Sequence, residues 1–228
     1  KAIGETEFVN GIAAMSASGK YGKTKICAGI VGFADLTMGA AVEEVLAAQV
    51  AAGNGRFRGT RYGAGFDPSP DINNSHTNPP AHIYQDPKFR EGFAKLADFD
   101  LSFEAWLYHT QIGDVSSLAD AFPDQRIVLN HFAGPMGIGP YAGKSAEILP
   151  KWRADIQELA ERPNVYAKLG GLGMVINGFK FEDRPTPPGS EELAQIWRPY
   201  FETCIEAFGP KRCMFESNFP VDKVTSRY

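Results

Sequence analysis

Short apolar runs recur along this 228-residue chain, and their lengths suit buried strands. Each run is bounded by turn residues or by a stretch with helical spacing, as in a sheet whose strands alternate with helices. The pattern predicts six strands, at Ile26–Val31, Phe57–Tyr62, Leu101–Tyr108, Arg126–His131, Val165–Leu169 and Cys213–Phe215.

Apolar residues three and four positions apart predict helices before and between these strands. The first helix has no strand before it, and each of the others lies in the interval between two strands. The predicted helices are Thr6–Ser18, Gly39–Ala52, Lys88–Leu96, Val115–Ala121, Lys151–Glu161 and Glu191–Phe208.

Long segments follow three of the strands, at Gly63–Pro87, Phe132–Pro150 and Gly170–Gly189. Alternating strands and helices predict the α/β class with a mainly parallel sheet, open or closed. In such folds the site lies where the strands end, so we expect function at this face. No GxGxxG follows the first strand and no GxxxxGK[ST] occurs, so the usual nucleotide-binding loops are unsupported.

The amino-acid composition narrows the possible domain organisation and the possible kinds of partner. With 43% hydrophobic and 22% charged residues, the chain has material for one large core, and we expect a single domain over residues 1–228. The net charge of −4 argues against a nucleic-acid partner, and no apolar run reaches the roughly 18 residues of a membrane span. A small-molecule substrate is therefore the expected partner, with a homo-oligomer left open.

Three cysteines, Cys27, Cys204 and Cys213, are widely spaced and odd in number, which suits reduced thiols in a cytoplasmic protein. The chain has no initiator methionine, and it stops at Tyr228 soon after the last predicted strand. A strand at the end of a domain is normally covered by a further element of the chain. We therefore expect a fragment, truncated at both ends.

Polar side chains gather at the ends of the predicted strands. Side chains alternate along a strand, so Met214, Glu216 and Asn218 are expected on one face. The same rule places His131 above Ile127 and Leu129. An apolar base below a polar tip is typical of a catalytic end. The candidate residues are Asp35, Arg61, Tyr62, Glu104, Tyr108, His109, Asn130, His131, Lys168, Glu216 and Asn218.

Each candidate also has a structural interpretation. Glu104, Lys168 and Glu216 would equally form a buried ion-pair network. Arg61 would either pair with Glu104 or hold a substrate carboxylate with its planar fork. His109 would equally be a loop residue whose side chain forms a hydrogen bond with the backbone. His131 favours function, because it ends an apolar run directly before a tight turn.

The chain resembles the amidohydrolase-related TIM-barrel hydrolases, the group containing sugar lactonases and pyrone dicarboxylate lactonase. The matching stretches are FRGTRYG at 57–63, LSFEAWLYH at 101–109, RIVLNHFAGP at 126–135, NVYAKLGGLG at 164–173 and RCMFESNFPVD at 212–222.

This resemblance covers nearly the whole chain and implies the third to eighth strands of a (β/α)8 barrel, with the first two strands and the last helix missing. It further implies that His131 matches the family's sixth-strand histidine and Asn218 its eighth-strand aspartate. Arg61 matches a fourth-strand arginine that meets substrate carboxylate or lactone oxygens.

Two departures from the family pattern bear on chemistry. The first-strand histidine motif is absent, and His131 and His109 fall short of the three protein ligands of a catalytic zinc. We therefore assign no metal ligand and leave a divalent metal, zinc, as an option for the full-length protein. Asn218 replaces an aspartate, and an amide orients water or stabilises an oxyanion but takes no proton at neutral pH.

The expected reaction is the addition of water to a lactone, ester or amide carbonyl of a small organic acid. His131 would polarise the carbonyl or position water, Asn218 would orient the nucleophile, and Arg61 and Lys168 would bind negative oxygen. Glu104, Tyr108 and His109 complete the expected substrate contacts.

Glu216 is a candidate general base, in competition with His131. Burial beside Met214 would favour Glu216 in that role, whereas pairing with Lys168 would make it structural. Two other functions stay open, a decarboxylase of the same barrel group and a non-catalytic barrel that binds a small acid.

Overall fold

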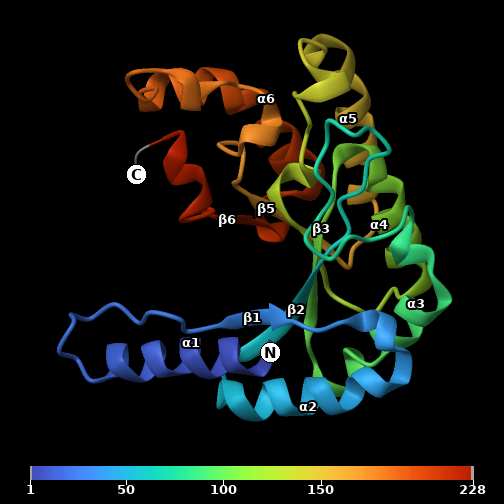
Figure 1. Ribbon diagram of the computed structural model, residues 1–228, viewed down its shortest axis with the longest axis vertical. Helices are drawn as coiled ribbons and strands as arrows, with labels where there is room; N and C mark the ends of the chain where they lie inside the picture. Colours follow the sequence, from blue (N-terminus) through green and yellow to red (C-terminus); the bar gives the residue numbers. More distant parts are fainter. Residues whose placement is uncertain (1, 227–228) are drawn as a thin grey trace. The chain divides into compact units, whose positions relative to one another are not determined.

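A computed structural model describes residues 2–226 of the chain (Figure 1). The chain divides into two compact units, an N-terminal unit of residues 1–62 and 84–104 and a C-terminal unit of residues 63–83 and 105–228. Six strands follow one another in the sheet in chain order, β1 to β6. The strand pairs β1–β2, β4–β5 and β5–β6 are parallel, which confirms the predicted α/β class.

In the N-terminal unit, helices α1 and α2 pack against each other and α1 lies along strand β1 (Figure 1). The Thr6 hydroxyl of α1 donates a hydrogen bond to the Gln49 side chain of α2, and Gln49 donates to the Phe33 carbonyl at 3.0 Å. The elements of this unit are α1 (Ala2–Ala17), β1 (Ile30–Phe33), α2 (Val42–Gly53), β2 (Phe57–Gly63), α3 (Pro87–Ala94) and the start of β3 (Ser102–Trp106).

Aromatic side chains fill the core of the N-terminal unit. Phe89 is central, because its ring contacts those of Tyr62, Tyr84, Phe93 and Phe103 at centroid distances of 5.1 to 6.4 Å. Helix α3 begins sharply, since Asp86 accepts hydrogen bonds from two backbone N–H groups of its first turn and Pro87 follows as the first helical residue. The cap thus fixes the helix that carries Phe89 into the core.

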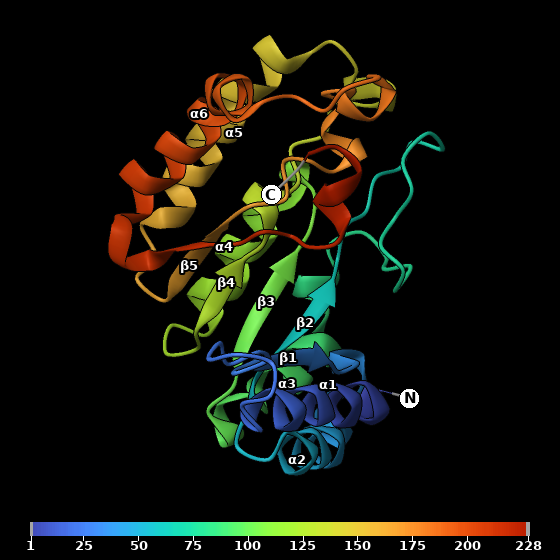
Figure 2. The same ribbon diagram turned by 90° about the vertical axis from the view of Figure 1, so that its left-hand side faces the viewer.

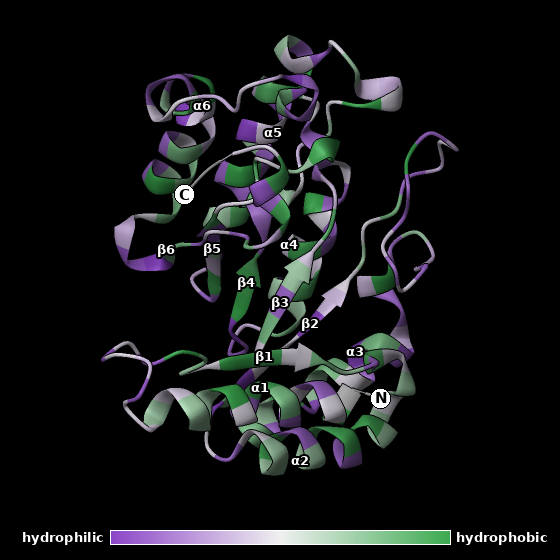
Figure 3. Ribbon diagram, turned by 60° about the vertical axis from the view of Figure 1, so that its left-hand side comes forward, coloured by the Kyte–Doolittle hydropathy of each residue, from purple (hydrophilic) through white to green (hydrophobic). Residues whose placement is uncertain are grey.

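In the C-terminal unit, α5 and α6 pack against each other (Figure 2). Trp152 and Tyr200 form part of this contact, with ring centroids 5.0 Å apart. All three residues of β4 are buried, and Figure 3 shows this strand at the hydrophobic end of the scale. The elements are α4 (Ile112–Ala121), β4 (Ile127–Leu129), α5 (Ser145–Ala160), β5 (Val165–Leu169), α6 (Ser190–Phe208) and β6 (Cys213–Phe215).

Arg212 fixes the start of β6. Its guanidinium donates to the carbonyls of Ala160 and Arg162 at 2.8 Å, and of Phe208 at 3.1 Å. These carbonyls lie at the ends of α5 and α6, where helices leave backbone acceptors unpaired. One side chain therefore ties both helices to the strand that leads into Glu216.

Several predicted boundaries differ from the observed ones. The first strand begins at Ile30 rather than Ile26, because Cys27 has a positive φ of 55° within a turn. The fourth strand ends at Leu129 and not at His131, whose φ is 54°. Helix α5 begins at Ser145, before the predicted start at Lys151, and includes Pro150. In residues 2–226, no helix has both the length and the apolar content needed to cross a membrane.

Candidate active site

His131 lies in a left-handed turn directly after β4. The φ angles of His131, Phe132, Ala133 and Gly134 are 54°, 56°, 56° and 45°. Residues other than glycine and asparagine rarely adopt left-handed backbone angles, and such strain persists where the surrounding structure fixes the backbone. Trp152 of α5 provides part of that hold, because its indole Nε1 donates to the Phe132 carbonyl at 2.8 Å.

Three of the predicted site residues come together in the C-terminal unit. Nδ1 of His131 contacts the Glu216 carboxylate, and Lys168 Nζ lies 3.8 Å from the other oxygen of that carboxylate. The side chains are 3% exposed for His131, 13% for Glu216 and 20% for Lys168. They come from the ends of β4 and β6 and from within β5, three strands in sequence in the sheet.

The contact with Glu216 favours one tautomer of the His131 imidazole. A carboxylate accepts and does not donate, so the orientation of the ring suits the tautomer with its proton on Nδ1, toward Glu216. The lone pair of the neutral ring is then on Nε2. The ring of Trp106 packs edge-on against the imidazole at a centroid distance of 4.9 Å. His131 is thus oriented on two sides.

Glycines after β5 allow the backbone to approach these side chains. A Cβ at Gly171 would lie 2.5 Å from His131 Nδ1, and one at Gly170 would lie 2.2 Å from the Glu216 carbonyl oxygen. Gly171 also has a φ of +92°, which other residues rarely adopt. The Gly-Gly-Leu-Gly segment of residues 170–173 is therefore shaped around the histidine and the strand end.

Asp222 belongs to the same region, although the sequence analysis did not select it. Its carboxylate accepts hydrogen bonds from Asn218 Nδ2 at 2.7 Å and from the Gly173 N–H at 3.3 Å. Burial raises the pKa of Asp222, against the opposing effects of these hydrogen bonds and of His131. Asp222 lies in the stretch RCMFESNFPVD. However, Asp222 follows the Phe-Pro turn of that stretch, where strand alternation no longer predicts which side chain is buried.

Asn218 does not continue the strand pattern. Strand β6 ends at Phe215 and Asn218 has a φ of 49°, so alternation past Glu216 does not determine its direction. Asn is one of the few residue types that tolerates this backbone region. The Asn218 side chain contacts Asp222, whereas the Glu216 side chain contacts His131.

Tyr108 and His109 are tied into loops of the C-terminal unit. The Tyr108 hydroxyl donates to the Asn73 carbonyl, and His109 Nδ1 accepts the Met136 N–H at 3.2 Å. Burial lowers the pKa of His109. Tyr141, whose ring packs against His109, donates to Asp67 at 2.6 Å; burial and this hydrogen bond raise its pKa to about 12. These contacts match the structural interpretation of His109.

Arg61 and Glu104 belong to the N-terminal unit, in β2 and β3. Glu104 is buried and Arg61 is partly exposed. Their roles in substrate binding remain predictions. Asp35 caps a short 3-10 turn, where its carboxylate accepts from the Thr37 N–H at 3.1 Å and from the Thr37 hydroxyl at 2.6 Å.

A cavity of about 150 Å³ adjoins the candidate residues. Glu216 and Asp222 contribute carboxylates to its lining, and Trp197 and Phe201 of α6 contribute aromatic rings. At about 30 Å³ for each water, the volume corresponds to roughly five waters. The cavity suits a small molecule or part of one.

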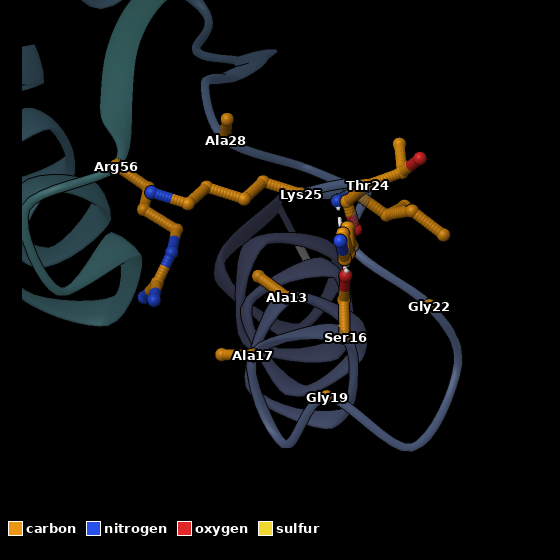
Figure 4. A pocket seen from close by; sticks show the side chains of 11 residues that line it. Ala13, Ser16, Ala17, Gly19, Gly22, Thr24, Lys25, Ala28 and Arg56 are labelled. Atoms are coloured by element: carbon orange, nitrogen blue, oxygen red, sulfur yellow. Dashed lines mark hydrogen bonds between the residues drawn. The ribbon is translucent and has the colours of Figure 1, made fainter.

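A larger hollow, about 930 Å³, lies in the N-terminal unit between the end of α1 and the segment after it (Figure 4). Ser16 bridges its wall, donating to the Thr24 carbonyl at 2.9 Å and accepting the Ile26 N–H at 3.0 Å. Its lining includes Lys23, Lys25 and Arg56 but none of the candidate catalytic residues.

The described residues do not fit a metal centre by themselves. Within residues 2–226, no group of three or more His, Cys, Asp or Glu side chains is arranged to hold a metal ion. His131 directs Nδ1 to Glu216, and Asp222 is engaged by Asn218 and Gly173. A catalytic zinc usually has three protein ligands.

Comparison with known proteins identifies the family. Residues 23–228 match the amidohydrolase family, and the chain belongs to it. The chain is 36% identical over 225 residues to the uncharacterized protein y4mH of Sinorhizobium fredii, covering 99% of this chain and 64% of that protein. It is 29% identical over 143 residues to an L-fucono-1,5-lactonase of Burkholderia multivorans, covering 63% of this chain and 45% of that enzyme.

Solved structures agree with this assignment. An amidohydrolase from Burkholderia multivorans with bound zinc superposes with a TM-score of 0.71 at 26% identity, over 98% of this chain and 67% of that one. The predicted family and the TIM-barrel type of fold are thereby confirmed. The chain spans 64% of the length of y4mH.

Proposed function

We propose that the protein is a hydrolase that adds water to the lactone or ester carbonyl of a small organic acid. The observation that carries the proposal is the His131–Glu216 contact, a buried imidazole oriented by a carboxylate at the end of β4. Membership of the amidohydrolase family and similarity to an L-fucono-1,5-lactonase support the same reaction class.

In the proposed mechanism His131 is the general base. Its Nε2 takes a proton from water while the water oxygen attacks the carbonyl carbon, and the carbonyl π electrons move to oxygen. When the tetrahedral intermediate collapses, the carbon–oxygen bond to the leaving group breaks. The leaving oxygen then receives the proton from His131.

The ion pairs support a division of labour between Glu216 and Lys168. Glu216 faces His131 Nδ1 and Lys168, which favours it as the group that orients the histidine over Glu216 as the base. At 3.8 Å the Lys168 contact is a charge interaction and not a hydrogen bond. We assign the Lys168 ammonium to the developing oxyanion, and Arg61 to a substrate carboxylate.

No step of this mechanism is routed through a metal. A relative with bound zinc motivates metal analysis of the protein, although no group of three or more His, Cys, Asp or Glu side chains among residues 2–226 is arranged to hold a metal ion. We further propose a cytoplasmic location, since Cys27, Cys204 and Cys213 are all free thiols.

The proposal is tested by measuring the hydrolysis of a panel of neutral and carboxylated sugar lactones, with the amount of acid released as the readout. His131→Asn should lower kcat about 10²-fold or more, the usual range for loss of a general base. Glu216→Gln should lower kcat about 10-fold, as expected for an orienting partner. Arg61→Met should raise KM for carboxylated lactones selectively.

Two outcomes would contradict the proposal. Full activity of His131→Asn would remove the histidine from the chemistry. Binding of the lactones by the wild-type protein without turnover would favour the non-catalytic acid-binding alternative.

A further inference from the structure

The contact between Asn218 and Asp222 determines which way the Asn218 amide faces. An ionised carboxylate only accepts hydrogen bonds, so the group that approaches Asp222 Oδ1 at 2.7 Å is the amide nitrogen, Nδ2. The carbonyl oxygen therefore lies on the other edge of the planar amide. With a non-polar partner in place of Asp222, the amide would be free to turn over.

Asp222 is itself held in place. The Gly173 N–H donates to the second oxygen of Asp222 at 3.3 Å, and the residue as a whole is 5% exposed. A Cβ at Gly173 would lie 2.9 Å from Asp222 Cγ, so the glycine backbone closes around the carboxylate. These two contacts leave Asp222 little freedom to follow a rotating amide.

Asp222 also borders the candidate site. Asp222 lines the same cavity as Glu216, and the glycine segment that holds Asp222 also abuts the His131 ring at Gly171. A water between two acceptors, His131 Nε2 and the Asn218 oxygen, would donate one hydrogen bond to each. One of the two lone pairs of the water oxygen would then be directed at the carbonyl carbon.

We propose that Asp222 is a positioning residue that locks the Asn218 amide with its oxygen toward the reacting water, so that Asn218 serves as an acceptor and not as an oxyanion donor. This inference rests on the proposed hydrolase function. The single carboxylate that the family resemblance implies at position 218 is thus divided, in this chain, between an amide that contacts water and a carboxylate behind it.

The test exchanges the two side chains. Asp222→Asn should lower kcat about 10- to 100-fold with KM little changed, as for loss of an outer partner. The double variant Asn218→Asp/Asp222→Asn restores a donor–acceptor pair in the opposite sense. It should recover kcat to within about 3-fold of wild type and add an acidic limb to the pH profile, because a carboxylate now faces the water.

A merely structural role for Asp222 gives a different pattern. Asp222→Asn would then lower Tm and leave kcat within about 2-fold of wild type in the folded protein, and the double variant would show no new pH limb. Either result overturns the proposal. Asp183→Asn, at the exposed end of the 3-10 helix Phe181–Asp183, is the matched control for removing one carboxylate.

A readout without catalysis separates this inference from the proposed function. In the wild-type protein labelled with 15N-asparagine, the Asn218 side-chain amide signal is identified by its loss in Asn218→Asp. If Asp222 holds Nδ2, that signal should shift as the pH falls and the carboxylate is protonated, even if no lactone is hydrolysed. An amide signal that does not respond between pH 7 and 4 would overturn the inference, including where Asp222→Asn fails to fold.

Discussion

At the residue scale, the approach of Gly171 to the His131 ring decides which side chain position 171 can carry. The backbone there has a φ of +92°, and a Cβ would lie 2.5 Å from Nδ1, closer than real contacts allow. The obstacle is an imidazole held by Glu216 and Trp106, and not the end of a flexible chain. A methyl group must therefore move the histidine or the strand end.

Gly171→Ala should lower the free energy of unfolding by about 2–4 kcal/mol, through backbone strain and overpacking. Urea denaturation measures the change. Gly113→Ala is the matched control, because Gly113 lies on the exposed face of α4 with nothing within 4 Å of the added methyl group. That variant should gain about 0.5–1 kcal/mol. Equal effects at both positions would contradict the close approach.

His109 predicts a pH dependence of stability. Burial lowers its pKa in the folded protein, so below about pH 6.5, the pKa of an exposed histidine, the unfolded state binds more protons. Stability should therefore fall as the pH falls from 7 to 5.5, with a limiting slope of about 1.4 kcal/mol per pH unit for one proton. His109→Asn keeps an acceptor for the Met136 N–H and should flatten this slope. Identical slopes in the two proteins would exclude His109 as the source.

Residue-level prediction from the sequence identified polar residues at and just past the ends of the apolar runs, and it did not extend to the turns that follow. The sequence analysis selected His131, Lys168 and Glu216, and the structure brings these three together. It did not select Asp222, because no apolar periodicity surrounds that residue. Nor does the composition of His-Phe-Ala-Gly predict left-handed φ angles, since Phe and Ala seldom adopt them.

At the element scale, helix α5 supports the turn that carries His131. Trp152 is fully buried and donates to the Phe132 carbonyl at 2.8 Å, so the helix fixes a strained segment that local preferences do not favour. Predicted elements agree with observed ones in number and order, whereas several ends differ. The start of α5 is one example. In the sequence Pro150 indicates a helix boundary, so the predicted helix begins after it, whereas the observed helix includes Pro150.

Trp152→Phe should destabilise the protein by about 1–3 kcal/mol, because a buried carbonyl loses its donor. It should also lower kcat for the proposed lactone hydrolysis, since the His131 turn loosens. Trp197→Phe on α6 is the control. No partner for Trp197 Nε1 is found among residues 2–226, so this change removes no hydrogen bond and should be nearly neutral in thermal denaturation. A larger loss of Tm at Trp197 would refute this account.

At the scale of the whole molecule, the fold class followed from the alternation of strands and helices, which is a property of the entire chain. The two strands at the ends of the sheet order, β1 and β6, expose apolar side chains. Phe215 of β6 is 82% exposed and Val31 of β1 is 40% exposed. An apolar end strand is a template for pairing with another chain.

The polypeptide of residues 1–228, expressed alone, should therefore self-associate as its concentration rises, which light scattering would detect. Phe215→Lys should reduce this association, because a charged side chain opposes edge pairing. Gln157→Lys, at an exposed position of α5, adds the same charge without removing apolar surface and should have little effect. A monodisperse monomer at high concentration would contradict the expectation.

The contact between Gly171 and His131 also bears on how related sequences can diverge. A side chain at position 171 and an imidazole at position 131 exclude each other in space, so the two positions are not free to drift separately. We expect them to covary among homologues: lineages that replace the histidine with a smaller residue can accept alanine or serine at 171. Lineages that keep the histidine should keep the glycine. In this sense a residue without a side chain would record, in an alignment, whether the neighbouring imidazole is retained.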